Sequence, residues 1–600
     1  MTETDATADA TASAAQMAEN WQRIAERSQS VMQSFMERNA GAPAHLGDST
    51  NMFGAFMAMT SQMMSDPAKL MQGQMDLWQS HMKLWQHATE RMLGNHGDGE
   101  PVVAPKADDR RFRDPAWQEN AVFDYIKQSY LLTAQWMQDT VQDVEGLDDK
   151  TAKKVSFYTR QFADALAPTN FVMTNPEVLR ETVDSKGENL VRGLDNLLRD
   201  LERGEGELKI TMTDMDAFEV GKDVAASPGQ VVFRNDMMEL IQYTPTTETV
   251  HTRPLLMVPP WINKFYILDL RPKNSLVKWA TDQGYTVFMI SWVNPDDKLA
   301  EKSFADYMLE GPVAALDAIE QATGKREVVT MALCLGGTLL ACTLAYLTAI
   351  GDDRIKSATF MASLVDFSDP GELGVFIDQE QIESLEKRME DKGGVLDASA
   401  MSNTFNMLRA NDLIWSFVVN NYLLGKDPFP FDLLYWNADS TRMPAKMHSF
   451  YLRNMYQKNA LREPGGIELA GHKLDLGKVT TPVYVLATKE DHIAPWQSCY
   501  AATQLYGGPV HFVLGGSGHI AGITNSPASA KYPYWTNSRK PKTPQAWLEA
   551  AKEHDGSWWI DWQRWQTRHA GKKVPAREPG DGKLKPIMPA PGAYVMEKAK

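Results

Sequence analysis

From about residue 206 onward, short apolar runs alternate with longer segments of helical periodicity. Strands that alternate with helices favour a mostly parallel sheet with helices on its faces. Residues 206–600 are therefore predicted to form one α/β domain. The runs predicted as strands are Leu255–Val258, Thr286–Ile290, Val328–Leu333, Ala358–Ala362, Val483–Ala487 and His511–Leu514.

A long insertion interrupts this alternation. About 120 residues separate the fourth and fifth predicted strands, and most of them, roughly 366–475, are helical in character and rich in aromatic residues. An insertion at this point would lie over the carboxyl ends of the strands. We therefore predict a helical cap over residues 366–475.

The chain before the α/β pattern is predicted to be mostly helical. Residues 1–20 are rich in Ala, Thr and Asp, and they lack the basic and apolar regions of a signal peptide, so we expect a disordered tail. Residues 21–93 form a Met- and Trp-rich helical region. A linker of Gly, Pro and charged residues, 94–108, separates it from a helical domain over 109–205.

One helix of the Met- and Trp-rich region carries an apolar stripe. Asp66 and Pro67 predict its start, as N-cap and first helical residue. The stripe recurs at steps of four and three residues and consists of Met71, Met75, Trp78, Met82 and Trp85. It either packs on its own chain or a second copy, or it contacts a hydrophobic surface or partner, since Met suits adaptable contacts.

Composition narrows the classes of function. The 600 residues carry a net charge of −16, which leaves no basic surplus for a nucleic-acid partner. The three cysteines cannot all pair within one chain, and none has a C-x-x-C metal spacing. We therefore expect a reduced, cytoplasmic compartment and neither a metal nor a cofactor.

One uncharged stretch is long enough to cross a membrane. Val328–Ile350 has 23 residues without a charge. Its start is β-branched, however, and Gly336 and Gly337 interrupt its middle. A buried strand, a tight turn and a buried helix explain this pattern better, so we predict no transmembrane segment.

The same stretch has the context of a nucleophile elbow, in which a sharp turn between strand and helix exposes the nucleophile. In Ala332-Leu333-Cys334-Leu335-Gly336, cysteine replaces the usual serine of G-x-S-x-G, and Ala332 replaces the first glycine. The helix N-terminus favours a thiolate at Cys334, and the Leu335 N–H would face a developing oxyanion. Alternatively, Cys334 is a small buried hydrophobe, as most lone cysteines are. Cys342 and Cys499 are interpreted as structural.

The residues that follow support the elbow, because in the α/β-hydrolase fold the nucleophile precedes the acid and the acid precedes the histidine. Asp491 follows the fifth predicted strand and His519 follows the sixth, so they are the predicted acid and base. Glu490 is the rival acid. His492 is the rival base, but its place beside the acid fits a supporting role better.

A second oxyanion donor is expected after the strand Leu255–Val258. Pro259 and Pro260 have no N–H to donate. Trp261 or Ile262 remains, and Ile262 is taken as the candidate. A cysteine nucleophile also suggests a thioester substrate such as an acyl-CoA, because thiolates exchange readily with thioesters and keep the acyl group activated.

The chain resembles class I polyhydroxyalkanoate synthases from about Asp109 to its end. The runs that carry the resemblance are Pro168–Phe171, Phe233–Asn235, Pro259–Leu270, Ser291–Trp292, Asn294–Asp296, Pro430–Asn437, Gly556–Trp559 and Ala590–Val595. Several are long, so chance agreement is negligible.

The resemblance implies an acyltransferase that polymerises (R)-3-hydroxyacyl-CoA, most typically 3-hydroxybutyryl-CoA, and releases CoA. Cys334 would carry the growing chain as a thioester, with His519 and Asp491 as the family's catalytic histidine and aspartate. Members of the family act as homodimers on the surface of cytoplasmic polymer granules. The Met- and Trp-rich helices would suit dimer or granule contact.

Two positions depart from the family's pattern. Ala332 stands where glycine is usual, and Trp261 stands where a smaller residue is expected, which would narrow the pocket. Two other functions compete with the polymerase. A thioesterase- or lipase-like hydrolase would use the same three residues but admit water, and a non-catalytic granule-coating protein would need Ala332 to disable the elbow.

Overall fold

The computed structural model describes residues 55–63, 67–93, 100–107, 109–142, 144, 146–206 and 208–598, together with residues 19, 20, 22, 23 and 26. The predicted tail, the predicted cap residue Asp66 and part of the predicted linker lie largely outside these residues. The chain divides into two compact units, Met1–Asp214 with Phe405–Phe429, and Met215–Thr404 with Pro430–Lys600. The predicted cap, 366–475, is thus shared between them.

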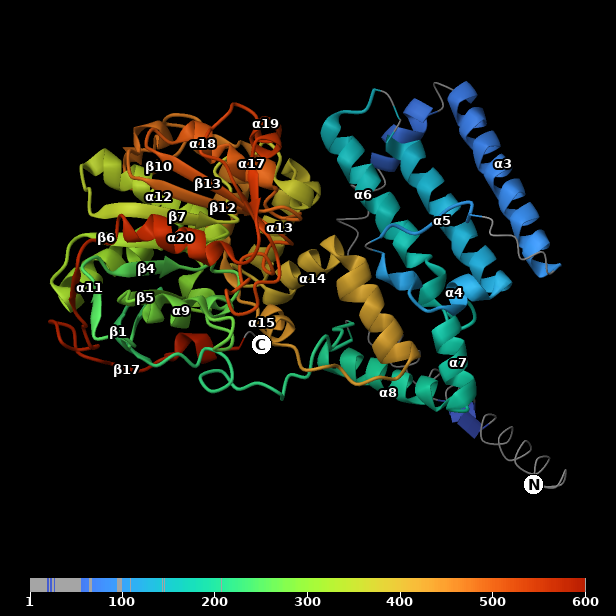
Figure 1. The fold of residues 1–600 in the computed structure, drawn as a ribbon, viewed down its shortest axis with the longest axis horizontal. Helices are drawn as coiled ribbons and strands as arrows, with labels where there is room; N and C mark the ends of the chain where they lie inside the picture. Colours follow the sequence, from blue (N-terminus) through green and yellow to red (C-terminus); the bar gives the residue numbers. More distant parts are fainter. Residues whose placement is uncertain are drawn as a thin grey trace. The chain divides into compact units, whose positions relative to one another are not determined.

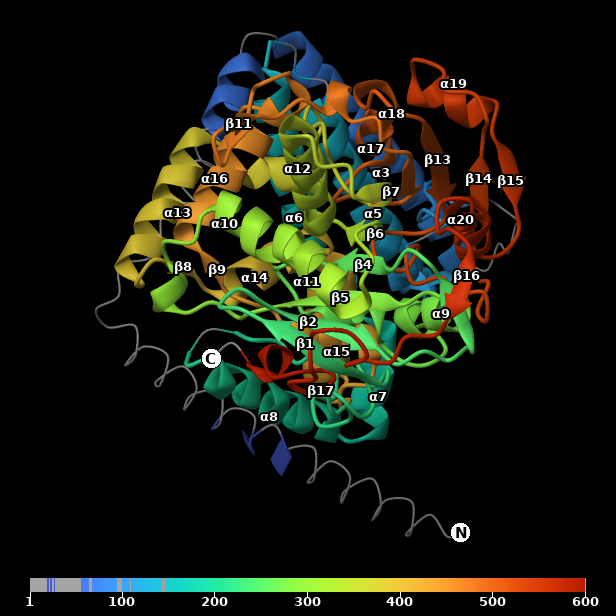
Figure 2. The ribbon, with the colours of Figure 1, turned by 90° about the vertical axis from the view of Figure 1, so that its left-hand side faces the viewer.

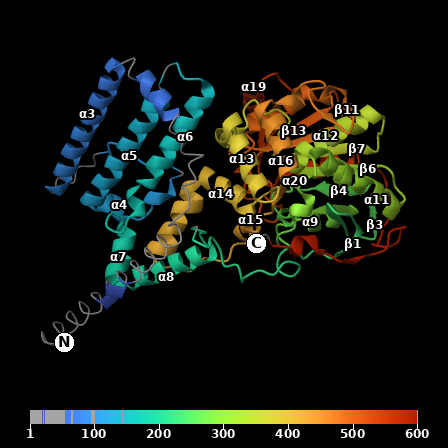
Figure 3. The ribbon, with the colours of Figure 1, turned by 180° about the vertical axis from the view of Figure 1, so that it is seen from behind.

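The first unit is helical. Its helices are α3 (Pro67–Met92), α4 (Ala116–Glu119), α5 (Ala121–Gln142), α6 (Asp149–Ala165), α7 (Pro176–Asp184) and α8 (Glu188–Arg203). The starts of α6 and α7 follow from capping chemistry, because the Asp148 and Asn175 side chains accept hydrogen bonds from the first free N–H groups. Helices α3, α5 and α6 lie side by side (Figure 3).

The apolar stripe of α3 is exposed. Leu84 and Ala88 are buried, whereas Met71, Met75, Trp78 and Trp85 have more than half of their surface exposed. Helix α3 therefore packs on α5 through a different set of side chains, and the stripe is exposed in the described part of the chain.

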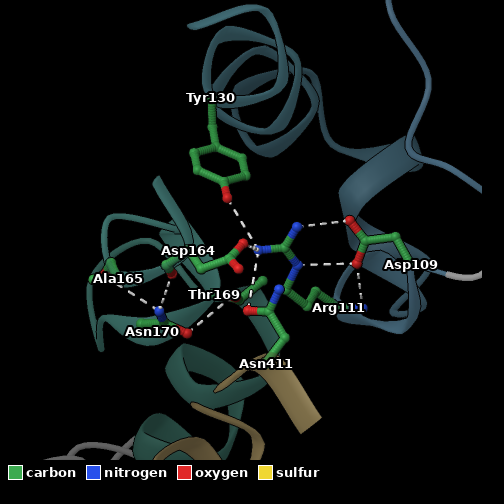
Figure 4. A network of polar contacts seen from close by, with 8 residues as sticks. All are labelled: Asp109, Arg111, Tyr130, Asp164, Ala165, Thr169, Asn170 and Asn411. Atoms are coloured by element: carbon green, nitrogen blue, oxygen red, sulfur yellow. Dashed lines mark hydrogen bonds and ion pairs between the residues drawn. The ribbon is translucent and has the colours of Figure 1, made fainter. Parts of the chain in front are cut away.

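A polar network joins the helices to the segment 405–429. Arg111 hydrogen-bonds Asp109 at 2.9 Å, Tyr130 at 3.0 Å, Asp164 at 3.1 Å and Asn411 at 3.4 Å (Figure 4). A guanidinium has five donors, so one side chain can hold several elements in register.

Helix α8 meets the same segment at very close range. A Cβ on Gly193 would lie 1.8 Å from the Tyr422 carbonyl oxygen, so only glycine allows this approach. Asn189 and Asn196 donate to the Leu423 and Asn421 carbonyls at 2.8 Å and 3.0 Å. These contacts satisfy carbonyl groups of Phe405–Phe429 from α8.

The second unit is built on an eleven-stranded sheet with the order β15-β14-β13-β12-β7-β6-β4-β5-β2-β1-β17 (Figure 1). The six central strands from β13 to β5 are parallel and correspond to the six predicted strands. They are β4 (Leu255–Val258), β5 (Val287–Trp292), β6 (Val328–Leu333), β7 (Ile355–Met361), β12 (Val483–Thr488) and β13 (Val510–Gly515). The predicted α/β fold is confirmed.

Antiparallel strands extend both edges of the sheet. They are β1 (Gly229–Arg234), β2 (Met238–Tyr243), β14 (Tyr534–Thr536), β15 (Lys552–His554) and β17 (Met588–Pro589). Short two-stranded pairs lie outside the main sheet: β3 (Thr249–His251) with β16 (Lys573–Pro575), β8 (Val395–Leu396) with β9 (Met443–Pro444), and β10 (Glu468–Leu469) with β11 (His472–Lys473).

Helices cover both faces of the sheet (Figures 1 and 2). In the sheet, β5 lies on one side of the neighbouring strands β4 and β6, and β7 lies on their other side. The chain therefore moves in one direction across the sheet from β4 to β5 and in the opposite direction from β6 to β7. Right-handed crossovers therefore place α9 (Leu276–Asp282) and α12 (Leu335–Ile350) on opposite faces. Three buried tryptophans of helix α20 (Trp558–Thr567) belong to the same apolar core as the buried side chains of α9.

The remaining helices of this unit are α10 (Phe304–Met308), α11 (Ala314–Thr323), α13 (Gln379–Asp391), α15 (Asp432–Ala438), α16 (Ala445–Tyr451), α17 (Trp496–Tyr500), α18 (Ala502–Leu505) and α19 (Pro544–Glu549). Helix α14 (Ala398–Leu408) crosses the boundary of the two units along the chain. Among the described residues, every helix is too short or too polar to cross a membrane. The uncharged stretch Val328–Ile350 instead forms β6, a turn and α12, as predicted.

Candidate active site

The candidate site lies where the strand order reverses. Strands β4 and β6 are neighbours, yet the connections that follow them lead to opposite faces of the sheet. Loops after such a pair of strands diverge and leave a crevice at the carboxyl ends. Cys334 follows β6 directly, and the loop from Pro259 follows β4.

Cys334 occupies a strained turn between β6 and α12. Its backbone has φ 51° and ψ −119°, in a region that costs a residue with a side chain about 1–3 kcal/mol. Its N–H donates to the Met361 carbonyl oxygen at 2.9 Å, and its own carbonyl oxygen accepts from Gly337 and Thr338. The turn is therefore held from both sides, and it places the half-buried thiol at the helix N-terminus.

The two glycines after Cys334 are required by close packing. A Cβ on Gly336 would lie 2.3 Å from the Val258 carbonyl oxygen, and one on Gly337 would lie 2.0 Å from the Ser363 hydroxyl. Ala332, in contrast, is a fully buried residue of β6 paired with Val258 and needs no glycine conformation. The departure at Ala332 therefore leaves the elbow intact.

Asp491 is a buried carboxylate whose two oxygens are both occupied. Oδ1 accepts from the Ile493 and Ala494 N–H groups at 2.9 Å and 2.8 Å. Oδ2 accepts from the Thr488 hydroxyl at 3.2 Å and pairs with His519 Nδ1 at 2.7 Å. Burial opposes ionisation, but the imidazole and the donors outweigh it and lower the pKa of Asp491.

His519 lies between Asp491 and Cys334. Its Nδ1 is bonded to Asp491, which leaves Nε2 as the ring nitrogen available to the nearby Cys334 sulfur. Burial disfavours the imidazolium, yet the Asp491 carboxylate and the Cys334 sulfur together hold the pKa of His519 well above its ordinary value. The arrangement therefore favours proton transfer from the thiol to the ring.

The loop after β4 passes against the first turn of α12, as the short distance from Gly336 to Val258 requires. Its carbonyl groups are bound: Pro259 accepts from Trp292 Nε1 at 3.0 Å, and Trp261 accepts from the Thr441 hydroxyl at 2.5 Å. Among the described residues, the N–H groups of Trp261, Ile262 and Leu335 all have no acceptor, so Trp261 remains the rival of Ile262 as the second donor.

An aromatic wall near Cys334 was not predicted from the sequence. The rings of Tyr451 and Tyr456 pack edge-on, with centroids 5.6 Å apart. Burial, followed by the charge on neighbouring groups that include the Cys334 sulfur, raises the pKa of both phenols. Trp261 packs edge-on to Tyr451, with ring centroids 5.9 Å apart. The only signal in the sequence was the aromatic composition of the predicted cap.

The rival residues lie in different surroundings. Glu490 is exposed, in contrast to the buried Asp491. His492 accepts from the Glu372 N–H through its backbone carbonyl oxygen, and its predicted supporting role is left untested. Cys342 and Cys499 are fully buried, and burial raises the pKa of both thiols, so neither favours a thiolate. No cluster of metal-ligating side chains occurs in the described residues.

The chemistry open to this arrangement is acyl transfer. A sulfur nucleophile, a buried base, a carboxylate behind it and two free amides are the parts that form and resolve a tetrahedral intermediate at a carbonyl carbon.

Comparison with known families gives two matches. Residues 108–280 match the poly-beta-hydroxybutyrate polymerase (PhaC) N-terminus, and residues 255–526 match the alpha/beta hydrolase fold. The second match confirms the predicted α/β-hydrolase fold.

Individual relatives extend over most of the chain. The poly(3-hydroxyalkanoate) polymerase of Methylorubrum extorquens is 55% identical over 83% of this chain and 82% of its own length. The poly(3-hydroxyalkanoate) polymerase subunit PhaC of Rhizobium meliloti is 48% identical over 93% and 92%. The subunit of the same name from Cupriavidus necator is 42% identical over 84% and 85%.

Proposed function

Since the chain belongs to the poly(3-hydroxyalkanoate) polymerase family, we propose that it joins (R)-3-hydroxyacyl units, taken from their coenzyme A thioesters, into a polyester and releases CoA. The observation that carries this proposal is Cys334 at the strained turn after β6, with His519 acting on it electrostatically and bonded to Asp491 at 2.7 Å. The preferred substrate is 3-hydroxybutyryl-CoA, because the wall of Trp261 and Tyr451 narrows the pocket.

The first step loads the enzyme. His519 takes the proton of Cys334, and the sulfur attacks the thioester carbonyl carbon. The resulting oxyanion accepts hydrogen bonds from the Ile262 and Leu335 amides. The bond to the CoA sulfur then breaks, the CoA thiolate leaves with the proton from His519, and the acyl group remains on Cys334 as a thioester.

The second step extends the chain. The 3-hydroxyl of another hydroxyacyl unit attacks the carbonyl carbon on Cys334 while His519 accepts its proton. An ester bond forms, the carbon–sulfur bond breaks, and the proton passes from His519 to Cys334. Asp491 orients the imidazole and stabilises its charge.

The experiment follows thioester loss and CoA release from (R)-3-hydroxybutyryl-CoA by the purified protein. Wild type is expected to release CoA and to become turbid with insoluble polymer. Cys334→Ala should abolish both, whereas Cys342→Ala, a matched change within the helix that follows, should retain them. Release that survives Cys334→Ala would overturn the assigned nucleophile.

The two competing functions give different products. A hydrolase of the same fold would release CoA together with free 3-hydroxybutyrate and form no polymer. A granule-coating protein would bind polymer but release no CoA. The cysteine nucleophile argues against the first, and the assembly of Cys334, His519 and Asp491 at the strained turn argues against the second.

The proposed setting is the surface of cytoplasmic polyester granules, with the enzyme as a homodimer. The exposed stripe of α3 supports this part of the proposal, because solvent-exposed Met and Trp side chains of this number indicate a contact surface. An insoluble apolar product or a second copy of the chain would each cover it.

A further inference from the structure

A short segment after α15 lies along the loop that carries the candidate oxyanion amide. Asn263 and Ser440 form an antiparallel bridge, and both belong to the second unit. Thr441 is buried and contributes two bonds: its hydroxyl donates to the Trp261 carbonyl oxygen at 2.5 Å, and its N–H donates to the Ile262 carbonyl oxygen at 3.2 Å.

These bonds determine the direction of the amides. In a trans peptide, the N–H points away from the C=O of the same plane. The Trp261 carbonyl shares its plane with the Ile262 N–H, and the Trp261 carbonyl points to Thr441. The Ile262 N–H must therefore point away from Thr441, and it has no acceptor in the described chain.

The surroundings keep this arrangement rigid. Arg442 N–H donates to Asn294 Oδ1 at 3.0 Å, and Trp436 Nε1 donates to the Lys264 carbonyl oxygen at 2.7 Å. Tyr266 donates to Asp439 at 2.9 Å. Thr441 is thus flanked by bonds to the loop after β4 on one side and to Asn294, which follows β5, on the other.

We infer that Thr441 is a positioning residue that orients the Ile262 amide toward the oxyanion of the tetrahedral intermediate. The inference rests on the proposed function and adds a residue to Cys334, His519 and Asp491. The hydrogen bonds of Thr441 go to the carbonyl oxygens of Trp261 and Ile262. Thr441 acts through the peptide plane between Trp261 and Ile262.

Thr441→Val tests the inference, because it removes the hydroxyl, preserves the shape and retains the backbone N–H. Thr441→Ser restores the hydroxyl. The control is Thr343→Val, which removes another buried hydroxyl, bonded to the Leu339 carbonyl oxygen at 2.8 Å within α12. For each full-length variant, kcat and KM for CoA release are measured, together with the rate at which iodoacetamide alkylates Cys334.

Alkylation separates positioning from general damage. It requires the thiolate, but displacement of iodide forms no oxyanion. Loss of a whole oxyanion donor costs about 10²–10³-fold in kcat, so a misdirected donor should cost about tenfold. We expect this loss in Thr441→Val with KM changed by less than about twofold, an unchanged alkylation rate, rescue by serine and no effect of Thr343→Val.

Three results would overturn the inference: wild-type kcat in Thr441→Val, an equal loss of alkylation and turnover, or a serine variant as slow as the valine variant. Failure of the proposed function has a different signature. In that case wild type itself would release no CoA although Cys334 is alkylated, and the inference would fail with it.

Discussion

Asp491 and His519 form a coupled pair whose electrostatics can be tested directly. The carboxylate raises the pKa of His519 against the effect of burial. A base with a raised pKa becomes neutral only at higher pH, so the activity of wild type should rise with pH through the pKa of His519.

Asp491→Asn should move this rising limb to lower pH. The amide oxygen can still accept from the Ile493 and Ala494 N–H groups, but the negative charge is gone. Without it, burial lowers the pKa of His519, and the maximum of kcat/KM falls because the imidazolium loses its counter-ion. The measurement is kcat/KM for CoA release between about pH 5 and 10. A limb that stays in place would contradict the coupling.

Trp261 is the residue on which the length of the acyl side chain should depend. It is 2% exposed and packs against Tyr307 and Tyr451, with centroid distances of 5.5 Å and 5.9 Å. Trp261→Cys opens space beside the sulfur. Since each methylene that a pocket accepts or rejects changes kcat/KM by about tenfold or more, we expect the ratio of six- to four-carbon substrates to rise at least tenfold. An unchanged ratio would show that Trp261 does not limit the length of the acyl side chain.

Chain order explains which of these residues the sequence could reveal. Cys334, Asp491 and His519 each follow an apolar strand, so strand ends alone bring them to one edge of the sheet. Tyr451 and Thr441 reach the site through tertiary contacts more than a hundred residues from Cys334 in the sequence, and no local pattern marks them. The place of these two residues could be known only from the three-dimensional structure.

At the scale of elements, the elbow depends on the contact between α12 and the end of β4. The Val258 carbonyl oxygen belongs to the backbone of a fully buried strand, so it cannot yield to a methyl group on Gly336. Gly336→Ala should therefore displace the first turn of α12, destabilise the protein by about 1–3 kcal/mol and reduce CoA release at least a hundredfold.

Gly73→Ala is the matched control for this change. Gly73 also lies in a helix, and its added Cβ would meet only Trp136 Nε1 at an ordinary 3.5 Å. Alanine in a helix interior is favoured over glycine by about 0.5–1 kcal/mol, so this variant should keep activity and unfold no earlier than wild type. Thermal unfolding and CoA release check both variants. Equal behaviour of the two would show that the elbow tolerates the methyl group.

The strands that the sequence did not predict are the antiparallel ones at the sheet edges. Strand β2 is fully buried, yet it contains Glu239 and Gln242, which break the apolar pattern. Glu239 is accommodated because Arg234 pairs with it and the Ala593 and Tyr594 N–H groups donate to it. The two N–H groups that bind the Glu239 carboxylate come from the far end of the chain. The sequence around Glu239 therefore does not show that it can be buried in a strand. Strands β14 and β15 have only three residues each.

At the scale of the molecule, the chain leaves the second unit and returns to it. Phe405–Phe429 groups with the first unit, although it lies between two parts of the second. The bonds from α8 to Leu423 and Asn421 join residues more than two hundred positions apart, which explains why composition alone assigned this segment to a cap. The first unit is thus completed only after Met215–Thr404 of the second unit has been synthesised.

The exposed stripe of α3 gives the last prediction. A methionine side chain that leaves water contributes on the order of 1.5–3 kcal/mol, so five apolar side chains can hold the protein on an apolar surface. We expect Met75→Gln/Trp78→Gln/Trp85→Gln to reduce the fraction of protein that sediments with polymer, while initial CoA release from soluble substrate stays within about twofold of wild type. The exposed fractions of these three side chains are 55%, 64% and 57%.

Val122→Gln serves as the control, because Val122 is 52% exposed on α5 but lies outside the stripe. It should sediment with polymer as wild type does. A triple variant that still sediments fully would exclude the stripe as the polymer contact. If the triple variant instead changes from dimer to monomer in polymer-free ultracentrifugation, the stripe joins two copies of the chain, and attachment to the granule must come from another surface. The stripe would then affect polymer growth only through the stability of the dimer.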